Sequence, residues 1–294
     1  MKKSINERLF ISINYALIFI FAAACLYPMI LAVSVSFSDE YTIVTKGFKL
    51  IPEKFSTFTY QYFFADKGPK ILDSYMVTLF VVIVGTISSL FVTTGYAYAT
   101  TVKSFKLRNI LSFFAFFTML FNGGMLPWYI LSTKYYQLGN KIYGLILPYL
   151  MNVFLMYVIA NFLRTIPEEV FESAKIDGAG HFTIFFRLVL PIAKVGIITI
   201  TLFYALQYWN DWYLALMLIT DEKLYPVQYR LYTMLTNAQF VASGQHSQMS
   251  EHVVVPVLTA RMAMTCVATG PIILAYPLVQ KYFVKGITLG AVKG

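Results

Sequence analysis

Six long apolar stretches divide this chain, and they constrain its fold more than any other feature. A helix needs about 20 apolar residues to cross the hydrocarbon core of a bilayer, and each stretch reaches that length. The stretches are residues 9–37, 71–101, 109–131, 142–163, 195–220 and 257–283. The sequence therefore predicts an all-α integral membrane protein with six transmembrane helices.

Composition excludes several other classes of protein. Of the 294 residues, 58% are hydrophobic and 13% are charged, whereas a soluble domain carries about 25% charged residues. This hydrophobicity excludes intrinsic disorder. The net charge of +9 comes from 23 basic residues scattered without a basic stripe, so we expect no nucleic acid among the partners. The two cysteines, Cys25 and Cys266, exclude a disulfide scaffold and a zinc ribbon, and we expect no metal site.

The first stretch has two interpretations. Lys2, Lys3 and Arg8 precede an apolar run, as in a secretory signal peptide, and residues 22–25 have the form of a lipoprotein cleavage box. The apolar run continues to Phe37, however, which is too long for the core of a signal peptide. We therefore expect an uncleaved helix followed by a long outer loop.

Basic residues between the stretches predict the orientation in the membrane. With both termini in the cytoplasm, thirteen of the 23 basic residues lie inside, including Lys103, Lys106 and Arg108 in one short loop. The outside basic residues lie mostly in two long loops, 38–70 and 221–256, which carry less weight. Nearly all of the net charge then faces the cytoplasm, where anionic lipid or an acidic partner would meet it.

The inside segment of residues 164–191 differs from the short turns elsewhere. Pro167 fits the first position of a helix, and Glu168 and Glu169 follow in its first turn, where the helix dipole favours anions. Gly178 and Gly180 fit the end of that helix and a change of direction. The pattern predicts two short amphipathic helices at a glycine turn. Their apolar faces are given by Val170, Phe171, Ala174 and Ile176 in the first and by Phe182, Phe185, Phe186 and Leu190 in the second.

The spacing in this segment resembles the signature loop of permease subunits of ABC importers. The matching positions are Glu172, Ser173, Ala174, Gly178, Leu188, Leu190 and Pro191. Ser173 is the one departure, because the family usually has alanine there. The resemblance implies the type I ABC importer permease fold, with six transmembrane helices and a cytoplasmic coupling-helix loop.

Further stretches are similar to carbohydrate importers, in particular to the second permease subunit of the maltose-permease-like group. They are Tyr208-Trp209-Asn210-Asp211-Trp212, Tyr225-Pro226-Val227-Gln228 and the stretch from Gln280 to Gly294. Residues 121–127 resemble the branch that imports oligosaccharides. The implied organisation is an N-terminal helix and outer loop in 1–70 and a permease core in 71–294. The core contains the coupling loop 164–191 and a C-terminal tail 284–294.

The resemblance implies partners and contact residues. The family's coupling helix sits in a cleft of an ATPase subunit, and the matching residues here are Glu172, Ser173, Ala174, Asp177, Gly178 and Ala179. The tail would reach the same ATPase through Lys285, Gly290 and Lys293. The implied complex contains a second, different permease, two ATPase subunits and an extracellular solute-binding protein in the plasma membrane of a bacterium.

The chain carries no catalytic residues that we identify and no ATP site of its own. It lacks the Gly-x-x-x-x-Gly-Lys-Ser/Thr phosphate loop, and no Gly-Lys pair occurs in it. We therefore expect ATP and Mg²⁺ to bind to the partner ATPases, and this chain not to be an enzyme.

Aromatic and amide side chains in or near the apolar stretches are candidates for a saccharide path, because aromatic faces stack on sugar rings and amides bond hydroxyls. The same residues also fit an aromatic belt at the membrane interface or packing inside the bundle. The candidates are Asn122, Trp128, Tyr149, Asn152, Tyr208, Trp209, Asn210 and Trp212.

Two other functions compete with the permease hypothesis. A stand-alone ion-coupled transporter or channel predicts several ionisable residues inside the membrane and inverted repeats. Asp211 is the notable acid within an apolar stretch, and no clear repeat is visible. A membrane-embedded enzyme ranks last, because the stretches contain no constellation of nucleophile, His and acid.

Overall fold

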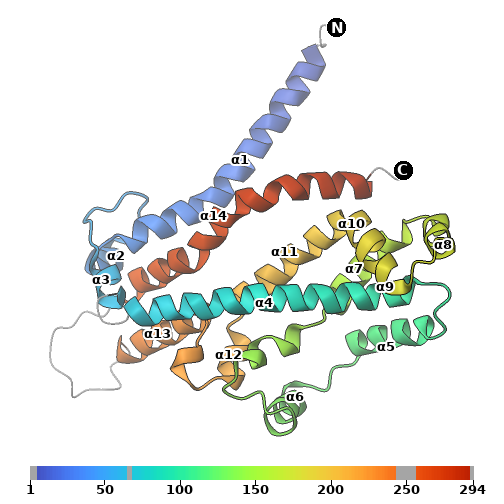
Figure 1. The fold of residues 1–294 in the computed structure, drawn as a ribbon. Coiled ribbons are helices and arrows are strands. Elements are labelled where there is room, and N and C mark those ends of the chain that lie inside the picture. Colours follow the sequence, from blue (N-terminus) through green and yellow to red (C-terminus); the bar gives the residue numbers. More distant parts are fainter. Residues whose placement is uncertain (1–4, 65–67, 243–255, 292–294) are drawn as a thin grey trace. The chain divides into compact units, whose positions relative to one another are not determined.

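The computed structural model describes residues 5–64, 68–242 and 256–291 (Figure 1). The predicted all-α fold is confirmed, since the structure is 79% helical and the described residues contain no β-strand. One isolated bridge pairs Ser38 with Phe55.

The helices follow one another along nearly the whole chain. The first half contains α1 (Ile5–Ser36), α2 (Glu40–Lys46), α3 (Phe58–Phe64), α4 (Gly68–Thr101), α5 (Arg108–Leu120), α6 (Met125–Ile130) and α7 (Val153–Arg164). The second half contains α8 (Glu168–Ile176), α9 (His181–Ile184), α10 (Leu190–Ile192), α11 (Lys194–Asn210), α12 (Tyr213–Leu218), α13 (Val227–Ala242) and α14 (Leu258–Ala291). Short π-helical turns at Leu131–Tyr135 and Phe185–Val189 continue α6 and α9.

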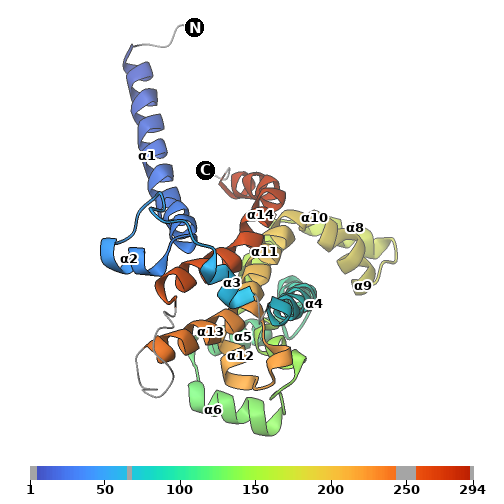
Figure 2. The ribbon, with the colours of Figure 1, turned by 90° about the vertical axis from the view of Figure 1, so that its left-hand side faces the viewer.

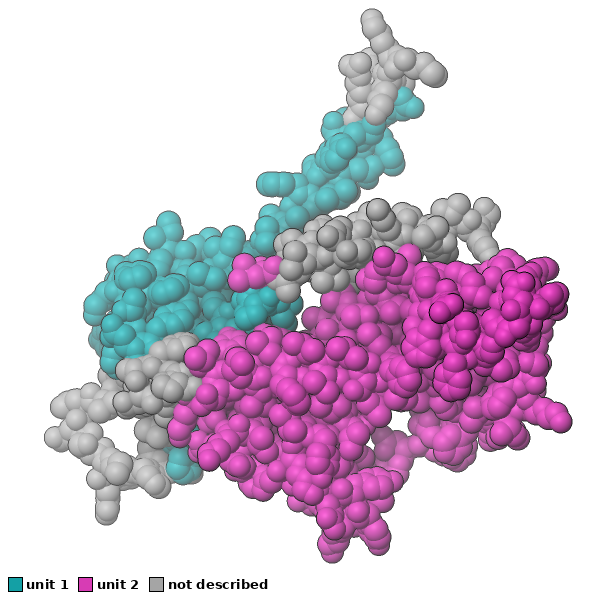
Figure 3. All heavy atoms as spheres, in the orientation of Figure 1, with its two compact units in different colours: residues 1–69, 231–272 teal, residues 70–230, 273–294 magenta. Residues whose placement is uncertain are grey.

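The chain forms two compact units, coloured separately in Figure 3. The first comprises residues 1–69 and 231–272, and the second comprises residues 70–230 and 273–294. Within the first unit, the N-terminal part of α1 extends away from α2 and α3 (Figure 2). Its apolar window has no buried residue, which suits a helix surrounded by lipid or by another chain.

Only some of the predicted membrane helices are continuous. By length and composition, α1 and α4 are each able to cross a membrane, and α14 is unbroken from Leu258 to Ala291. The predictions of one unbroken helix over 109–131 and of another over 142–163 are wrong. The first bends by 116° between α5 and α6, and the second bends by 53° between Tyr149 and Val153. The stretch 195–220 is divided into α11 and α12 at Asp211.

Each of these breaks carries an Asn or Asp side chain that accepts a backbone hydrogen bond. The Oδ1 atom of Asn122 accepts from the Gly124 N–H at 2.9 Å, and that of Asn152 accepts from the Leu155 N–H at 3.3 Å. Asp211 Oδ1 accepts from the Leu214 N–H at 3.4 Å. Backbone groups inside a bilayer have no water to bond, so a break is tolerated where a side chain satisfies them.

Two tyrosines of α11 lie in the core of the second unit with their hydroxyl groups bonded. Tyr208 Oη lies 2.8 Å from Ser89 Oγ and donates to the Ile146 carbonyl at 3.1 Å. Tyr204 Oη lies 2.5 Å from Thr93 Oγ1 and accepts from the Asn152 N–H at 2.8 Å. These bonds fasten α11 to α4 and to the start of α7.

A glycine of α4 makes room for one of these rings. A Cβ atom added at Gly85 would lie 2.7 Å from the Tyr208 ring, whereas one added at Gly95 on the same helix would meet no atom within 4 Å. Small residues at a helix interface allow such close approach in membrane proteins.

We expect Gly85→Ala to destabilise the protein by about 1–3 kcal/mol, because the buried Tyr208 ring must shift. The matched control is Gly95→Ala, which should be neutral or stabilising by about 0.5–1 kcal/mol. Thermal unfolding of both variants in the same detergent measures the difference. Equal melting temperatures would show that the α4–α11 contact is not close packed.

The turn before α13 is held by a buried arginine in the second unit. Arg230 Nε donates to Ser74 Oγ at 3.0 Å, Nη1 lies 3.2 Å from Glu222 Oε2, and the guanidinium lies 4.9 Å from the centre of the Tyr225 ring. Lys70, and next Arg230, lower the pKa of the Glu222 carboxyl below its usual value through hydrogen bonds. Arg230 and its partners thus connect this turn to the beginning of α4.

In the first unit, the segment after α1 caps the last long helix. The Glu40 carboxylate accepts from the backbone N–H groups of Val257, Leu258 and Thr259 at 3.1, 2.8 and 2.9 Å, and from the Thr259 hydroxyl at 2.7 Å. Thr59 Oγ1 of α3 lies 2.8 Å from Thr259 Oγ1. An anion at a helix N-terminus satisfies unpaired N–H groups and meets the positive end of the helix dipole.

Removing the Glu40 carboxylate should therefore loosen the start of α14. Glu40→Ala is expected to cost about 1.5–3 kcal/mol, the range for hydrogen bonds to a charged group. Glu53→Ala is the control, since Glu53 is exposed and, among the described residues, pairs with the exposed Lys46 and Lys49. Hydrogen exchange at the first amides of α14 should rise in the first variant and not in the second.

Candidate functional site

The segment after α7 folds into the two short helices that its sequence predicts. Helix α8 begins at Glu168, one residue later than the predicted start at Pro167, with Glu168 and Glu169 in its first turn. Asp177 caps its C-terminal end, Gly178 has a positive φ of 81°, and the Ala179 N–H donates to the Ala174 carbonyl at 2.9 Å. Glycine takes this left-handed conformation without strain.

The second short helix leads into the long apolar helix α11. After Gly180, α9, its π-helical turn and α10 continue to Ile192, and α11 then starts at an angle of 82°. Phe185 is buried, and its ring lies 5.4 Å from that of Tyr98 on α4. Figure 2 shows α8, α9 and α10 as one group.

The two short helices have one face that packs against the core of their unit and one face that is exposed. Val170, Phe171, Ala174 and Ala179 pack against the core of their unit, together with Leu188 and Leu190. Ile176 and Phe182, which the sequence assigns to these apolar faces, are instead 85% and 81% exposed. They flank the turn at Gly178, because the backbone reverses there and turns both side chains away from the core.

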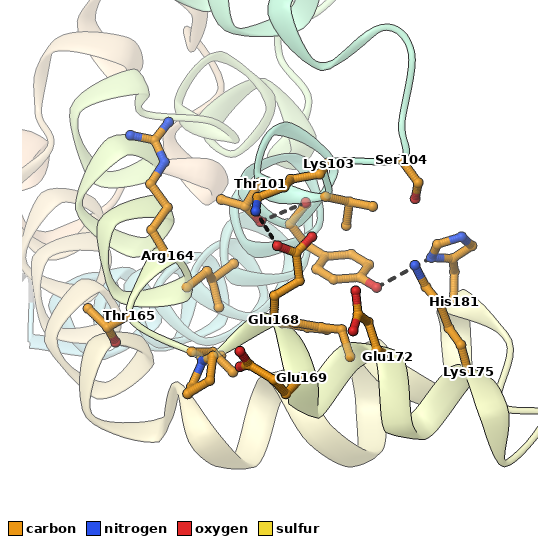
Figure 4. Close-up of a pocket in the computed structure, with 16 residues that line it drawn as sticks. Thr101, Lys103, Ser104, Arg164, Thr165, Glu168, Glu169, Glu172, Lys175 and His181 are labelled. Carbon is orange, nitrogen blue, oxygen red and sulfur yellow. Dashed lines mark hydrogen bonds and ion pairs between the residues drawn. The ribbon is translucent and has the colours of Figure 1, made fainter.

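A cleft of about 610 Å³ lies between α8 and the end of α4 (Figure 4). It is lined by charged groups of both signs, and Lys103 and Glu168 form an ion pair across it. Tyr98 Oη lies 3.4 Å from Nδ1 of His181. The Lys103–Glu168 ion pair is exposed, so it orients α8 and contributes little to the free energy of folding.

The predicted ATPase-coupling residues lie close together on this segment. Glu172 lines the cleft, Ser173 is exposed and donates to the Glu169 carbonyl at 2.8 Å, and Asp177 is exposed at the end of α8. Ala174 and Ala179 are half-buried against the core. Of the predicted tail contacts, Lys285 and Gly290 fall within the backbone of α14, where side-chain surroundings are not described, and Lys293 lies outside the described residues.

Gly178 provides a test of the turn. Gly178→Ala should cost about 1 kcal/mol through its positive φ and so raise hydrogen exchange at the last amides of α8 about fivefold. Gly180→Ala is the control, since Gly180 has a φ of −71° and open space around its α-carbon. Unchanged exchange in both variants would mean that the turn relaxes without cost.

A second candidate region lies where the apolar helices break. A pocket of about 300 Å³ is lined by Asn122, Trp128 and Tyr149 of the predicted saccharide path. The rest of its lining is Gly124, Met125, Pro148, Tyr213 and Leu214. The Trp128 and Tyr213 rings lie 6.2 Å apart with an interplanar angle of 32°.

The other path candidates have different surroundings. Tyr208 and Trp209 are buried in the core, and Asn152 caps α7. Asn210 is exposed and donates to the carbonyl of Leu206 in its own helix. Trp212 is part-exposed and meets the Tyr213 ring edge-on at 6.4 Å. The structure thus brings three of the eight candidates into one pocket.

Sequence reasoning missed several residues at both places. Tyr213 follows directly after the tryptophan-containing element, but nothing in the sequence separates it from the 21 other tyrosines. The sequence indicates only a role in membrane topology for Lys103, because its ion-pair partner Glu168 is 65 residues away. Within the described parts of the chain, no group of three His, Cys, Asp or Glu residues could hold a metal ion.

Comparison with known proteins identifies this architecture. Residues 91–289 match the family model described as "Binding-protein-dependent transport system inner membrane component". The chain belongs to this family. It is therefore the permease component of an ABC importer in a bacterial membrane, a transport component that works with ATPase and solute-binding partners.

Similar proteins extend over the whole length of the permease. The polygalacturonan/rhamnogalacturonan transport system permease protein YtcP of Bacillus subtilis is 38% identical over 98% of this chain and 100% of that protein. Protein LplC of the same organism is 36% identical over 92% of this chain and 90% of that protein. The arabinooligosaccharides transport system permease protein AraQ of Halalkalibacterium halodurans is 25% identical over 97% and 96%.

A solved structure has the same fold as the permease. A chain of a bacterial ABC transporter involved in the import of the acidic polysaccharide alginate matches with a TM-score of 0.78 and 29% identity, covering 96% of this chain and 99% of that chain. The predicted type I importer fold and the predicted resemblance to carbohydrate permeases are confirmed. The stand-alone ion-coupled transporter gains no support.

Proposed function

We propose that this permease is one of two different membrane subunits that together form the translocation path of an ATP-driven importer for an oligosaccharide. The names of its relatives, which refer to pectic polymers and to arabino-oligosaccharides, support the substrate class. The observation that carries the coupling role is the firmly seated α8–α9 segment with Ile176 and Phe182 exposed at its tip.

The tip has the features of a surface that docks into a groove of a partner. Large apolar side chains that are more than four-fifths exposed outside the apolar helices indicate a protein interface. The neighbouring Glu172 and Asp177 offer carboxylates for a basic partner, and Ser173 offers a small surface for close approach. The partner in this proposal is the ATPase subunit.

Seating on the core makes the segment able to transmit movement. Because α8 packs through Val170 and Phe171, and α9 through Phe185 against Tyr98, a displacement of the tip would pull on α4 and α11. Closure of two ATPases on ATP would then shift the bundle between two conformations, each favoured by a different set of contacts.

The remaining parts of the complex follow from this arrangement. ATP and Mg²⁺ would bind only to the ATPases, since this chain has no phosphate loop. The α8–α9 segment and both termini would face the cytoplasm, in agreement with the distribution of basic residues. Lys285, Gly290 and Lys293 would contact the ATPase from the C-terminal tail, and a solute-binding protein would deliver the saccharide from outside.

Affinity purification of the complex from mild detergent tests the proposal. We expect a second permease and ATPase subunits to co-purify with the wild type, and the double variant Ile176→Asp/Phe182→Asp to lose at least 90% of the ATPase. The loss follows because two charges would be buried in an apolar contact.

A matched control separates docking from folding. Phe105, in the turn between α4 and α5, is also exposed and apolar but lies outside the α8–α9 segment. Phe105→Asp should keep the ATPase, and both variants should keep the second permease. Full retention of the ATPase by the double variant would contradict docking at this tip.

A further inference from the structure

We propose that the pocket lined by Asn122, Trp128, Tyr149 and Tyr213 is a subsite for one uncharged sugar ring of the transported saccharide. This inference rests on the proposed function and adds the chemical class of ring that this subunit accepts. It also assigns Asp211 as a positioning residue behind the pocket.

Three aromatic residues line the pocket, and its volume suits a single sugar ring. Its volume of about 300 Å³ is at the lower end for small-molecule sites, which are mostly apolar with a few placed polar groups. Trp128, Tyr149 and Tyr213 contribute its three aromatic side chains. The negative faces of such rings attract the weakly positive C–H groups on the flat side of a pyranose.

Polar groups at the same place match sugar hydroxyls. Asn122 uses Oδ1 to accept from Gly124, so its Nδ2 group is directed elsewhere and bonds none of the described residues. The Trp128 Nε1–H and the Tyr213 hydroxyl likewise have no partner within the described parts of the chain. Two donors and one hydroxyl beside aromatic faces would satisfy the hydroxyl groups of a bound sugar.

Asp211 holds in place two residues that line the pocket. The Tyr149 hydroxyl donates to Asp211 Oδ1 at 2.9 Å, and the same oxygen accepts from the N–H of Leu214, whose side chain lines the pocket. Because its proton is directed to Asp211, the Tyr149 hydroxyl offers lone pairs to a ligand. Asp211 therefore determines both the position and the polarity of this part of the pocket.

The charges around the pocket favour an uncharged ring over a uronate. Among the described residues, no acidic or basic side chain lines the pocket, and none lines the neighbouring pocket that shares Trp128 and Pro148. Lys141 lies 5.4 Å from the centre of the Tyr143 ring, which lines that second pocket, and itself lines neither. The Asp211 carboxylate is bonded to Tyr149 of the first pocket and would repel a carboxylate.

An acidic saccharide would therefore bind through its carboxylates and through its uncharged groups at different places. One relative, YtcP, and the alginate importer are named for acidic polymers, whose carboxylates need cationic partners. This pocket supplies none, so any carboxylate would be bound elsewhere along the path. The ring held here would be neutral, or would present only its uncharged side.

Emission from Trp128 in the assembled importer tests the inference. The complex is placed in lipid nanodiscs, and the signal of Trp128 is the difference between the wild type and Trp128→Phe. Two probes are titrated: trigalacturonate, and the same trisaccharide after reduction of its carboxyl groups. We expect the neutral trisaccharide to half-saturate the change at a concentration at least tenfold lower.

Variants connect the signal to the pocket. Asn122→Ala should weaken the response to the neutral trisaccharide about tenfold, which corresponds to about 1.4 kcal/mol. Tyr129→Ala is the matched control, because Tyr129 is an aromatic residue of the same helix that lines neither pocket, and it should change nothing. Retained co-purification of the second permease shows that each variant is folded.

The outcomes separate this inference from the proposed function. Equal or tighter response to trigalacturonate, or no response to either probe, overturns the neutral subsite even when the ATPase co-purifies normally. Failure of the ATPase to co-purify overturns the proposed function but leaves the emission titration interpretable on the permease pair. A response of Tyr129→Ala equal to that of Asn122→Ala would also overturn the assignment.

Discussion

The need to satisfy backbone polar groups without water governs this structure. Continuous helices meet that need by themselves, and α1 and α4 are continuous. At three breaks in the other apolar helices, Asn122, Asn152 and Asp211 each accept a backbone N–H group. Each of these three breaks therefore carries a polar side chain that bonds a freed backbone group.

These breaks also create the chemistry of the permease core. Two of these three residues, Asn122 and Asp211, lie at the aromatic pocket, one in its lining and one bonded to Tyr149. A continuous helix would present only side chains to its neighbours. A break adds a bend, a polar side chain and space, which suit a small polar ligand inside an apolar bundle.

The α8–α9 segment is exposed on one face and packed firmly against the core on the other. Its inner face packs on the core through Val170 and Phe171, while Ile176 and Phe182 point outward beside Gly178. In the first unit, the segment after α1 also holds a long helix in place. There, Glu40 caps α14 and gives a structural role to a loop that contains no recognisable motif.

The sequence by itself determined the helical class, the apolar stretches, the α8–α9 pair and the family, because hydropathy, proline, glycine and motif spacing are local signals. Only the tertiary structure decided that Asn122, Trp128 and Tyr149 share a pocket while Tyr208 and Trp209 do not. It also decided that Ile176 faces outward and that Glu40 meets α14, more than 200 residues away. Periodicity places a residue on a face of its own helix, but which neighbour covers that face depends on contacts between distant parts of the chain.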